Sequence, residues 1–203
     1  YRVDRPVPDA RARRGDAVIA LASSGLHSNG YSLVRHILSQ RGIGYTDRSD
    51  ELGGVVGEVL LEPTRLYTSP LLRLLADAPG AVHALSHVTG GGIAANLARV
   101  LPRGAWVEND RSTWSAQPVF RVLAEMGGMR LEDAEGTWNL GIGMIAVVAA
   151  DAVAGTIERL VTGGIPAWQL GTVSTSARSL DGFEQGAKGV NGGAVRLVGR
   201  YRD

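Results

Sequence analysis

Two short polar segments, each carrying a histidine and glycines, are the places in this sequence where chemistry could occur. They are Ser23-Ser24-Gly25-Leu26-His27-Ser28-Asn29-Gly30 and His87-Val88-Thr89-Gly90-Gly91-Gly92. Each follows an apolar run and precedes a segment with helical periodicity. Glycines at such a turn let the backbone approach a ligand, and the first N–H groups of a helix lack internal partners, which suits a phosphate or another anion. The same residue types also cap helices that face only water, so the spacing alone leaves both interpretations open.

A third polar patch, residues 132–139, precedes the longest apolar run in the same manner and places Asn139 beside Leu140-Gly141-Ile142-Gly143. We interpret Gly141 and Gly143 as packing glycines, because no helix opens at them as it would in a dinucleotide fold. His36 falls on a helix face and His83 within a strand, so neither is assigned a function. The chain shows no Walker loop, no Ser-His-Asp spacing of a triad and no His/Asp cluster at metal-ligand spacing. The pattern therefore predicts an anion-binding domain and does not specify its function further.

The elements that must position these turns follow from hydrophobic periodicity. Strands are predicted at residues 16–21, 82–85, 106–108, 140–149, 168–173 and 195–201, with 140–149 as a central strand. Helices are predicted at residues 31–40, 70–75, 93–101, 118–126 and 153–161. Ser28 or Asn29 should cap the first helix and Gly42 should end it, while residues 46–54 read as a loop. Helices alternating with strands, some of them adjacent in sequence, predict an α+β (mixed α/β) fold, a mixed sheet flanked by helices.

Composition bounds the class of protein. The chain has 203 residues, 44% of them hydrophobic, enough for one large domain or two small ones. Its 21 basic and 20 acidic residues nearly balance, which argues against a nucleic-acid-binding surface. There is no cysteine, no apolar run of membrane-spanning length and no signal-peptide pattern, so a soluble, cytoplasmic protein is expected. The first residue is tyrosine, which indicates a piece of a longer product.

Six spaced motifs resemble one known family, the C-terminal domain of phosphoribosylformylglycinamidine cyclo-ligase, also called aminoimidazole ribonucleotide synthetase. The resemblance runs from Gly15 to about Val173. Its landmarks are Gly15-Asp16, Ser23 to Arg35, Leu61-Glu62-Pro63-Thr64-Arg65-Leu66-Tyr67, His87 to Gly92 with Asn96 and Arg99, Leu101-Pro102 with Pro118-x-Phe120, and Thr137 to Met144. Trp138 and Leu140 stand where the family more often has Phe and Met, and the tail after Ala177 lies outside the pattern.

The resemblance implies an ATP-dependent ring closure in purine biosynthesis. ATP would phosphorylate the formyl oxygen of formylglycinamidine ribonucleotide, and a nitrogen would then displace phosphate to give aminoimidazole ribonucleotide. ATP and Mg²⁺ would be held mainly by an N-terminal domain that also makes the homodimer interface and is missing from this chain. Residues 1–14 are then a linker from that domain, and residues 15–203 the C-terminal α/β domain, with a mobile Gly-rich tail at about 178–194. The fragment alone is expected to be inactive.

The resemblance also selects site residues. We expect His27 and Asn29 to be catalytic, and a small-molecule ribonucleotide to contact Ser28, His87, Thr89, Gly90, Gly91, Gly92 and, more weakly, Asn139. No metal ligand is expected in this chain. His27 is the favoured proton-transfer or phosphate-orienting side chain, because a histidine can exchange a proton near neutral pH.

Two alternatives stay open. One is another ATP-using member of the superfamily, either similar to selenophosphate synthetase or a kinase; those relatives carry other sequences at the triple-glycine turn and lack the His27 to Gly30 signature. The other is a non-catalytic binding module. No nucleic-acid or membrane partner is expected.

Overall fold

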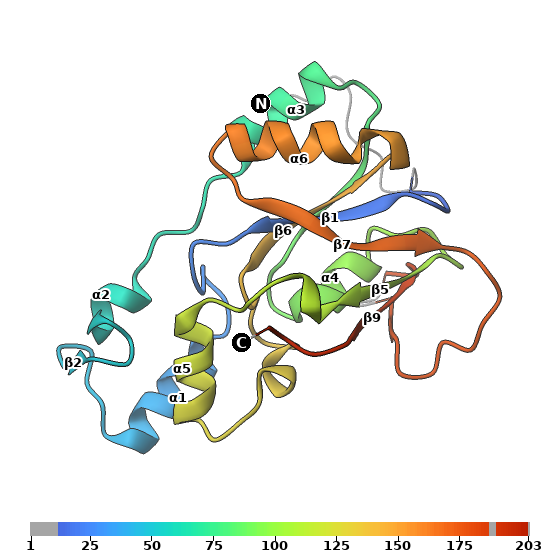
Figure 1. Cartoon of the computed structure of the whole chain (residues 1–203). Helices are drawn as coiled ribbons and strands as arrows, with labels where there is room; N and C mark the ends of the chain where they lie inside the picture. The colour runs from blue at the N-terminus through green and yellow to red at the C-terminus, as the bar shows by residue number, and fades with distance from the viewer. Residues whose placement is uncertain (1–11, 187–189, 203) are drawn as a thin grey trace.

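A seven-stranded mixed sheet, curled into a half-barrel with flanking helices, forms the frame of the molecule (Figure 1). The computed structural model describes residues 12–186 and 190–202. The sheet has the order β4-β6-β1-β7-β5-β9-β8, in which only β5 and β9 pair in parallel. Its strands are β1 (Ala17–Ala22), β4 (Val82–His87), β5 (Trp106–Asp110), β6 (Ile142–Val148), β7 (Ala167–Ser174), β8 (Glu184–Gln185) and β9 (Ala194–Val198).

Helices cover the sheet on both sides. They are α1 (Tyr31–Arg41), α2 (Val56–Leu60), α3 (Thr68–Asp77), α4 (Gly92–Ala98), α5 (Pro118–Met126) and α6 (Val153–Thr162), with the short 3₁₀ turns η1 (Arg111–Thr113), η2 (Leu131–Ala134) and η3 (Ala150–Ala152). In Figure 1, α3 and α6 lie together above the sheet, and α4 lies below it. Within residues 12–186 and 190–202, every helix is too short or too polar to cross a bilayer.

Strand β1 shows why the sheet needs cover on both faces. Ile19 and Leu21 point into the cluster made with α3 and α6, whereas Val18 and Ala20 point into the cluster made with α4. Side chains alternate between the faces of a strand, so an unbroken apolar run is stable only when both faces are buried. The run Ala-Val-Ile-Ala-Leu-Ala therefore fixes β1 as an interior strand, and β6 and β7 flank it.

A third apolar cluster lies outside the sheet, where α1 packs beside α5 (Figure 1). Phe120 and Trp138 are fully buried there, with ring centroids 6.1 Å apart. Val34, Ile37 and Leu38 of α1 complete the contact through the i, i+3, i+4 spacing of one helix face. This cluster anchors α1, whose first turn belongs to the candidate site.

The predicted mixed sheet with flanking helices is confirmed, and each predicted strand and helix has a counterpart. Helix α5 matches its predicted bounds, with Pro118 at its first position, where a missing N–H costs nothing. Gly42 ends α1 in a left-handed conformation, as expected. The strand predicted at 140–149 is β6, which is interior although β7 is the middle strand of the order.

Two local expectations, the cap of α1 and the loop at 46–54, were wrong or incomplete. The cap of α1 is Gly30, with a φ of 75°, and neither Ser28 nor Asn29 makes a side-chain cap bond. The predicted loop at 46–54 contains a two-stranded hairpin, β2 (Arg48–Ser49) and β3 (Gly54–Val55), followed by the unpredicted α2. Strand β8 lies within the Gly-rich tail predicted at 178–194. Residues 1–11 of the predicted linker and residues 187–189 of that tail lie outside the described residues.

Candidate functional site

The three polar segments meet at one edge of the sheet. Strands β1 and β4 are both antiparallel to β6, which lies between them, so they run in the same direction and end together where β6 begins. Leu21 and His87 both pair with Met144, which places the two turns at the same level. Backbone bonds extend the junction, from the Ser23 N–H to the Gly141 carbonyl at 2.8 Å and from the Val88 N–H to the Gly143 carbonyl at 3.0 Å. The two turns therefore lie side by side at the same edge of the sheet.

Asn139 ties the first turn to the start of β6. Its Nδ2 donates to the Gly25 carbonyl at 2.9 Å, and its Oδ1 accepts from the Ser23 hydroxyl at 3.1 Å and from the Gly141 N–H at 2.9 Å. The side chain is buried, and these bonds occupy its amide inside the protein. Asn139 is thus well placed to position the first turn against β6, and its expected weak contact with substrate stays a prediction.

Backbone strain marks the same edge of the sheet. In the described part of the chain, the non-glycine residues with positive φ are His27, at 57°, and Leu140, at 49°. A left-handed conformation costs such residues about 1–3 kcal/mol and persists where surrounding contacts hold it. The Trp114 indole supplies one of them, donating from Nε1 to the Leu140 carbonyl at 3.0 Å.

His27 lies inside the first turn rather than on its surface. It is 5% exposed, and its Nε2 accepts hydrogen bonds from the Ser24 N–H at 3.1 Å and from the Arg65 N–H at 3.4 Å. The ring stands edge-on to Tyr67, with centroids 6.1 Å apart. Gly143 forms the floor below both rings, where a Cβ atom would collide with the Tyr67 hydroxyl and with Cε1 of His27. Gly143 is a packing glycine, as predicted, and its lack of a side chain leaves room for the His27 ring.

Burial, followed by electrostatic repulsion from His87 and Arg65, lowers the pKa of His27 to about 4. The ring is therefore neutral at physiological pH. A pKa of about 4 disfavours proton donation by His27 near pH 7, and its expected role in proton transfer or in orienting a phosphate stays a prediction.

The segment from Leu61 to Tyr67 crosses over the first turn and is bonded to it. Besides the Arg65 N–H on His27, the Tyr67 hydroxyl donates to the Ala22 carbonyl at 2.8 Å and the Ser24 hydroxyl donates to the Pro63 carbonyl at 2.5 Å. The sequence resemblance singled this segment out without giving it a role. Its role is now visible: it covers His27 and fixes the ring.

A groove of about 400 Å³ opens between this covering segment and the first turn of α1. His27 and Ser28 line it on one side, Tyr31 and Arg35 on the helix, and Leu60 to Thr64 on the other side. Sequence analysis did not select Arg35 as a site residue. A signal was present, because residues four apart share a helix face and Arg35 follows Tyr31 by that spacing.

Ser28 is exposed and Asn29 half-exposed at the entrance to α1. Gly30, which follows them, has a left-handed backbone, and a Cβ there would collide with the indole of Trp138. The glycine is required by packing against a residue more than a hundred positions away. Sequence analysis could not find that contact, which is why the cap was misassigned.

The triple-glycine turn divides into an open part and a buried part. Gly90 is exposed and has open space at its Cβ position, whereas Gly92 is buried against the Glu135 carbonyl. Thr89 belongs to an internal network, since its hydroxyl donates to Asn96 Oδ1 at 3.1 Å and its carbonyl accepts from Asn96 Nδ2 at 3.1 Å. Gly92 donates its N–H to that same carbonyl at 3.1 Å. Thr89 and Gly92 thus shape the turn, and Gly90 and the half-buried Gly91 form its accessible part.

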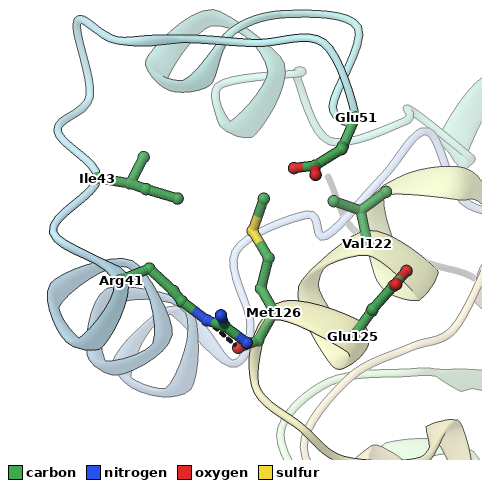
Figure 2. Close-up of a pocket in the computed structure, with 6 residues that line it drawn as sticks. All are labelled: Arg41, Ile43, Glu51, Val122, Glu125 and Met126. Atoms are coloured by element: carbon green, nitrogen blue, oxygen red, sulfur yellow. Dashed lines mark hydrogen bonds between the residues drawn. The ribbon is translucent and has the colours of Figure 1, made fainter.

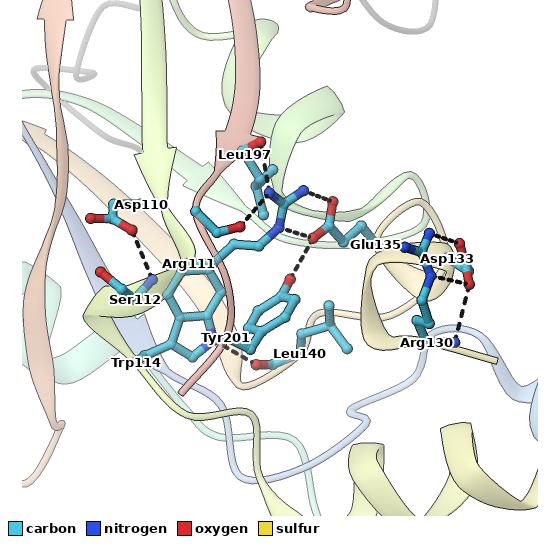
Figure 3. A network of polar contacts seen from close by, with 11 residues as sticks. Asp110, Arg111, Ser112, Trp114, Arg130, Asp133, Glu135, Leu140, Leu197 and Tyr201 are labelled. Atoms are coloured by element: carbon cyan, nitrogen blue, oxygen red, sulfur yellow. Dashed lines mark hydrogen bonds and ion pairs between the residues drawn. The ribbon is translucent and has the colours of Figure 1, made fainter. Parts of the chain in front are cut away.

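A polar clamp holds Glu135 against this turn (Figure 3). Arg111 binds both carboxylate oxygens of Glu135, at 2.6 and 2.9 Å, and the Tyr201 hydroxyl donates to Oε1 at 2.7 Å. Arg111 also donates to the Leu197 carbonyl at 2.9 Å. Burial, followed by the hydrogen bond to Glu135 and then by its charge, raises the pKa of Tyr201 well above its ordinary value, so the phenol stays protonated. The segment at the end of β9 thereby holds Glu135 in place, and the Glu135 carbonyl packs against Gly92.

The structure brings some predicted residues together and keeps others apart. His27 and Ser28 line the groove, and His87 is near enough to influence the charge of His27. His87 and Gly90 are exposed on the β4 side and do not line it. A different cavity, of about 290 Å³, lies at the far end of α1 between Arg41, Glu51 and Met126 (Figure 2), and none of the predicted site residues reaches it.

Residues 13–179 match a family described as AIR synthase related protein, C-terminal domain. The chain belongs to this family. A Streptomyces fradiae protein, provisionally named phosphoribosylformylglycinamidine cyclo-ligase, is 47% identical over 191 residues, covering 93% of this chain and 98% of that protein. The phosphoribosylformylglycinamidine cyclo-ligase of Sorangium cellulosum (strain So ce56) is 46% identical over 164 residues, or 80% of this chain and 47% of that protein. This AIR synthase related domain thus spans nearly all of one relative and about half of the other.

Solved structures agree on the fold. Thiamine-monophosphate kinase from Stenotrophomonas maltophilia K279a superposes with a TM-score of 0.59 at 18% identity, covering 93% of this chain and 52% of that one. The hydrogenase maturation protein HypE of E. coli gives a TM-score of 0.55 at 19% identity, covering 99% and 53%. At these identities the likeness concerns the fold alone.

Proposed function

We propose that this AIR synthase related domain is the ribonucleotide-binding half of an ATP-dependent cyclo-ligase, which converts formylglycinamidine ribonucleotide to aminoimidazole ribonucleotide. The observation that carries the proposal is the groove of His27, Ser28, Tyr31 and Arg35, built from the sequence motifs that led to the family. The names of the two relatives support the same activity.

The groove offers what a phosphorylated ribonucleotide needs. Arg35 provides a positive charge for a phosphate, Ser28 a hydroxyl, and Tyr31 an aromatic surface at the groove wall. Glu62, also in the lining, supplies an acceptor for a substrate N–H or hydroxyl group. The accessible part of the triple-glycine turn, Gly90 and Gly91, is proposed as a second contact, through backbone N–H groups.

ATP and Mg²⁺ are assigned to a second domain in this proposal. The residues of this chain fit a metal ion poorly, because within residues 12–186 and 190–202 no three His, Cys, Asp or Glu side chains gather as a metal-binding group. No step is therefore routed through the ion here. The chain binds and orients the ribonucleotide, while phosphoryl transfer and, in the full enzyme, a homodimer interface are placed on the other domain. A cytoplasmic location is proposed with the biosynthetic role.

Calorimetric titration of the purified 203-residue chain tests the proposal. Formylglycinamidine ribonucleotide should bind, and Arg35→Ala should weaken binding by about 10-fold or more, the range for a lost charge-assisted hydrogen bond. Arg103→Ala, at an exposed position away from the groove, is the matched control and should bind normally.

Thiamine monophosphate serves as the competing ligand in that titration, because a kinase of the same fold is the main alternative. Tighter binding of thiamine monophosphate than of the ribonucleotide would replace the proposed activity with a kinase-like one. If Arg35→Ala and Arg103→Ala change ribonucleotide binding equally, the groove is not the binding site.

A further inference from the structure

The hydrogen bonds around His27 decide which ring nitrogen carries the proton. Two backbone N–H groups, those of Ser24 and Arg65, point at Nε2. A backbone N–H can only donate, so Nε2 must present its lone pair to them. A hydrogen on Nε2 would face both donor hydrogens and break both bonds. The proton of the neutral ring therefore resides on Nδ1.

That Nδ1–H group has no acceptor in the part of the chain that the structure describes. Nδ1 is buried and makes no hydrogen bond within the described residues. A buried donor left without a partner costs about 1–3 kcal/mol, so native proteins seldom retain one without a ligand, an ordered water or a functional reason. His27 is among the residues that line the groove, so the acceptor that its Nδ1–H lacks can come from a ligand bound there.

Two of the titratable groups around the ring, His87 and Arg65, favour its neutral form. His87 faces it from β4, Arg65 and Tyr67 from the covering segment, and Gly143 of β6 contributes only backbone. No carboxylate hydrogen-bonds to the ring in residues 12–186 and 190–202. His27 therefore differs from a general base held by an acidic partner.

We propose that His27 is a fixed, neutral hydrogen-bond donor, whose Nδ1–H binds an oxygen of the ribonucleotide while the Ser24 and Arg65 amides lock the ring. The proposal rests on the proposed function and specifies the chemistry of the same groove. The acceptor is an oxygen that carries or gains negative charge, either a phosphate oxygen or the amide-type oxygen activated for ring closure. No proton is transferred, and the N–H bond stays intact. Arg65 and Tyr67 are positioning residues in this scheme.

Nitrogen-15 NMR of the histidine rings in the unliganded 203-residue chain tests the tautomer without reference to any activity. The chain has four histidines, and loss of one signal set in His27→Gln assigns the ring. At pH 7 the Nδ1 signal should have the shift of a protonated nitrogen and Nε2 that of an unprotonated one. An Nε2–H tautomer, or a ring protonated on both nitrogens at pH 7, would overturn the proposal.

Two variants test the donor, with binding of formylglycinamidine ribonucleotide as the readout. In His27→Asn the amide nitrogen lies close to the Nδ1 position, and asparagine tolerates a left-handed backbone. In His27→Gln the amide lies near Nε2 instead. Asn should retain affinity within a few-fold, whereas Gln should lose about 10-fold or more, the range for one hydrogen bond to a charged group.

The outcomes separate this proposal from the proposed function. If Gln binds as tightly as Asn, the donor role is wrong even though the groove binds the ribonucleotide. If the wild-type chain binds no ribonucleotide, the proposed function and the donor role fall together. The NMR spectrum still decides the tautomer by itself.

Discussion

At the scale of single residues, His27 has the sequence context of an acid–base group but is buried and neutral in the folded chain. Its sequence context, a histidine among small polar residues, indicates proton transfer. Its surroundings exclude the charged form at neutral pH, because the ring is buried and the Ser24 and Arg65 amides occupy Nε2. The candidate could be found from the sequence. Its protonation state could not, since Arg65 reaches it only through the tertiary fold.

The pKa of His27 predicts how stability depends on pH. Its value in the folded chain, about 4, lies below the ordinary value of 6.5, so the unfolded chain binds the proton more readily. The contribution of His27 to the free energy of unfolding is constant above pH 6.5. It decreases as pH falls from 6.5 toward 4, by at most about 3 kcal/mol. Urea unfolding across that range should show a shallower loss of stability in His27→Gln than in the wild type. Identical pH profiles for the two proteins would contradict the assigned environment of His27.

Asn139 should matter for stability rather than for ligand contact. Asn139→Ala leaves the Ser23 hydroxyl, the Gly141 N–H and the Gly25 carbonyl without their partner, so we expect a loss of about 2–4 kcal/mol in the free energy of unfolding. Asn29→Ala, at a half-exposed position of the same turn, is the control and should change stability by less than about 0.5 kcal/mol. Denaturant unfolding monitored by tryptophan fluorescence measures both. A stable Asn139→Ala variant would show that the amide is not the link between the turn and β6.

At the scale of elements, helix boundaries that depend on a single local residue could be predicted from the sequence. Pro118 fixes the start of α5, and Gly42 ends α1. The hairpin of β2 and β3 escaped prediction because two-residue strands leave no periodic pattern. Gly30 escaped because its requirement comes from Trp138, distant in sequence. The convergence of β1, β4 and β6 at one edge depends on the strand order, which is a property of the whole sheet and is not encoded in any single segment.

The triple-glycine turn yields a prediction that separates packing from binding. Gly92→Ala introduces a Cβ into the Glu135 carbonyl at a left-handed backbone position and should destabilise the protein by about 2 kcal/mol or more. Gly90→Ala meets open space and should leave the melting temperature unchanged, yet weaken ribonucleotide binding by obstructing the backbone.

The control for these variants is Gly53→Ala, in the β2–β3 hairpin. Gly53 shares a left-handed φ of 81° and has open space around it, so it reports the cost of strain alone. Thermal unfolding and ribonucleotide titration are compared for the three variants. Normal ribonucleotide affinity in Gly90→Ala would make the glycines of this turn packing residues only.

At the scale of the whole molecule, the sheet forms a frame with one functional edge. Three apolar clusters fix the sheet and the α1–α5 pair, and the Arg111–Glu135–Tyr201 clamp connects the end of β9 to the triple-glycine turn. The fold class and the family follow from the sequence, because hydrophobic patterning and motif order are carried along the chain. The groove cannot be derived from the sequence, because its walls come from α1 and from the covering segment that packs over it.

The central claim is that this chain supplies the ribonucleotide half of a cyclo-ligase, and a chimera tests it most directly. The C-terminal half of the Sorangium cellulosum relative is replaced by this chain, and ATP-dependent formation of aminoimidazole ribonucleotide is measured. The chimera should close the ring, Arg35→Ala within it should lower kcat/KM by about 10-fold or more, and the isolated chain should be inactive. A folded chimera that binds ATP but forms no product, or product formed by the isolated chain, would contradict the account.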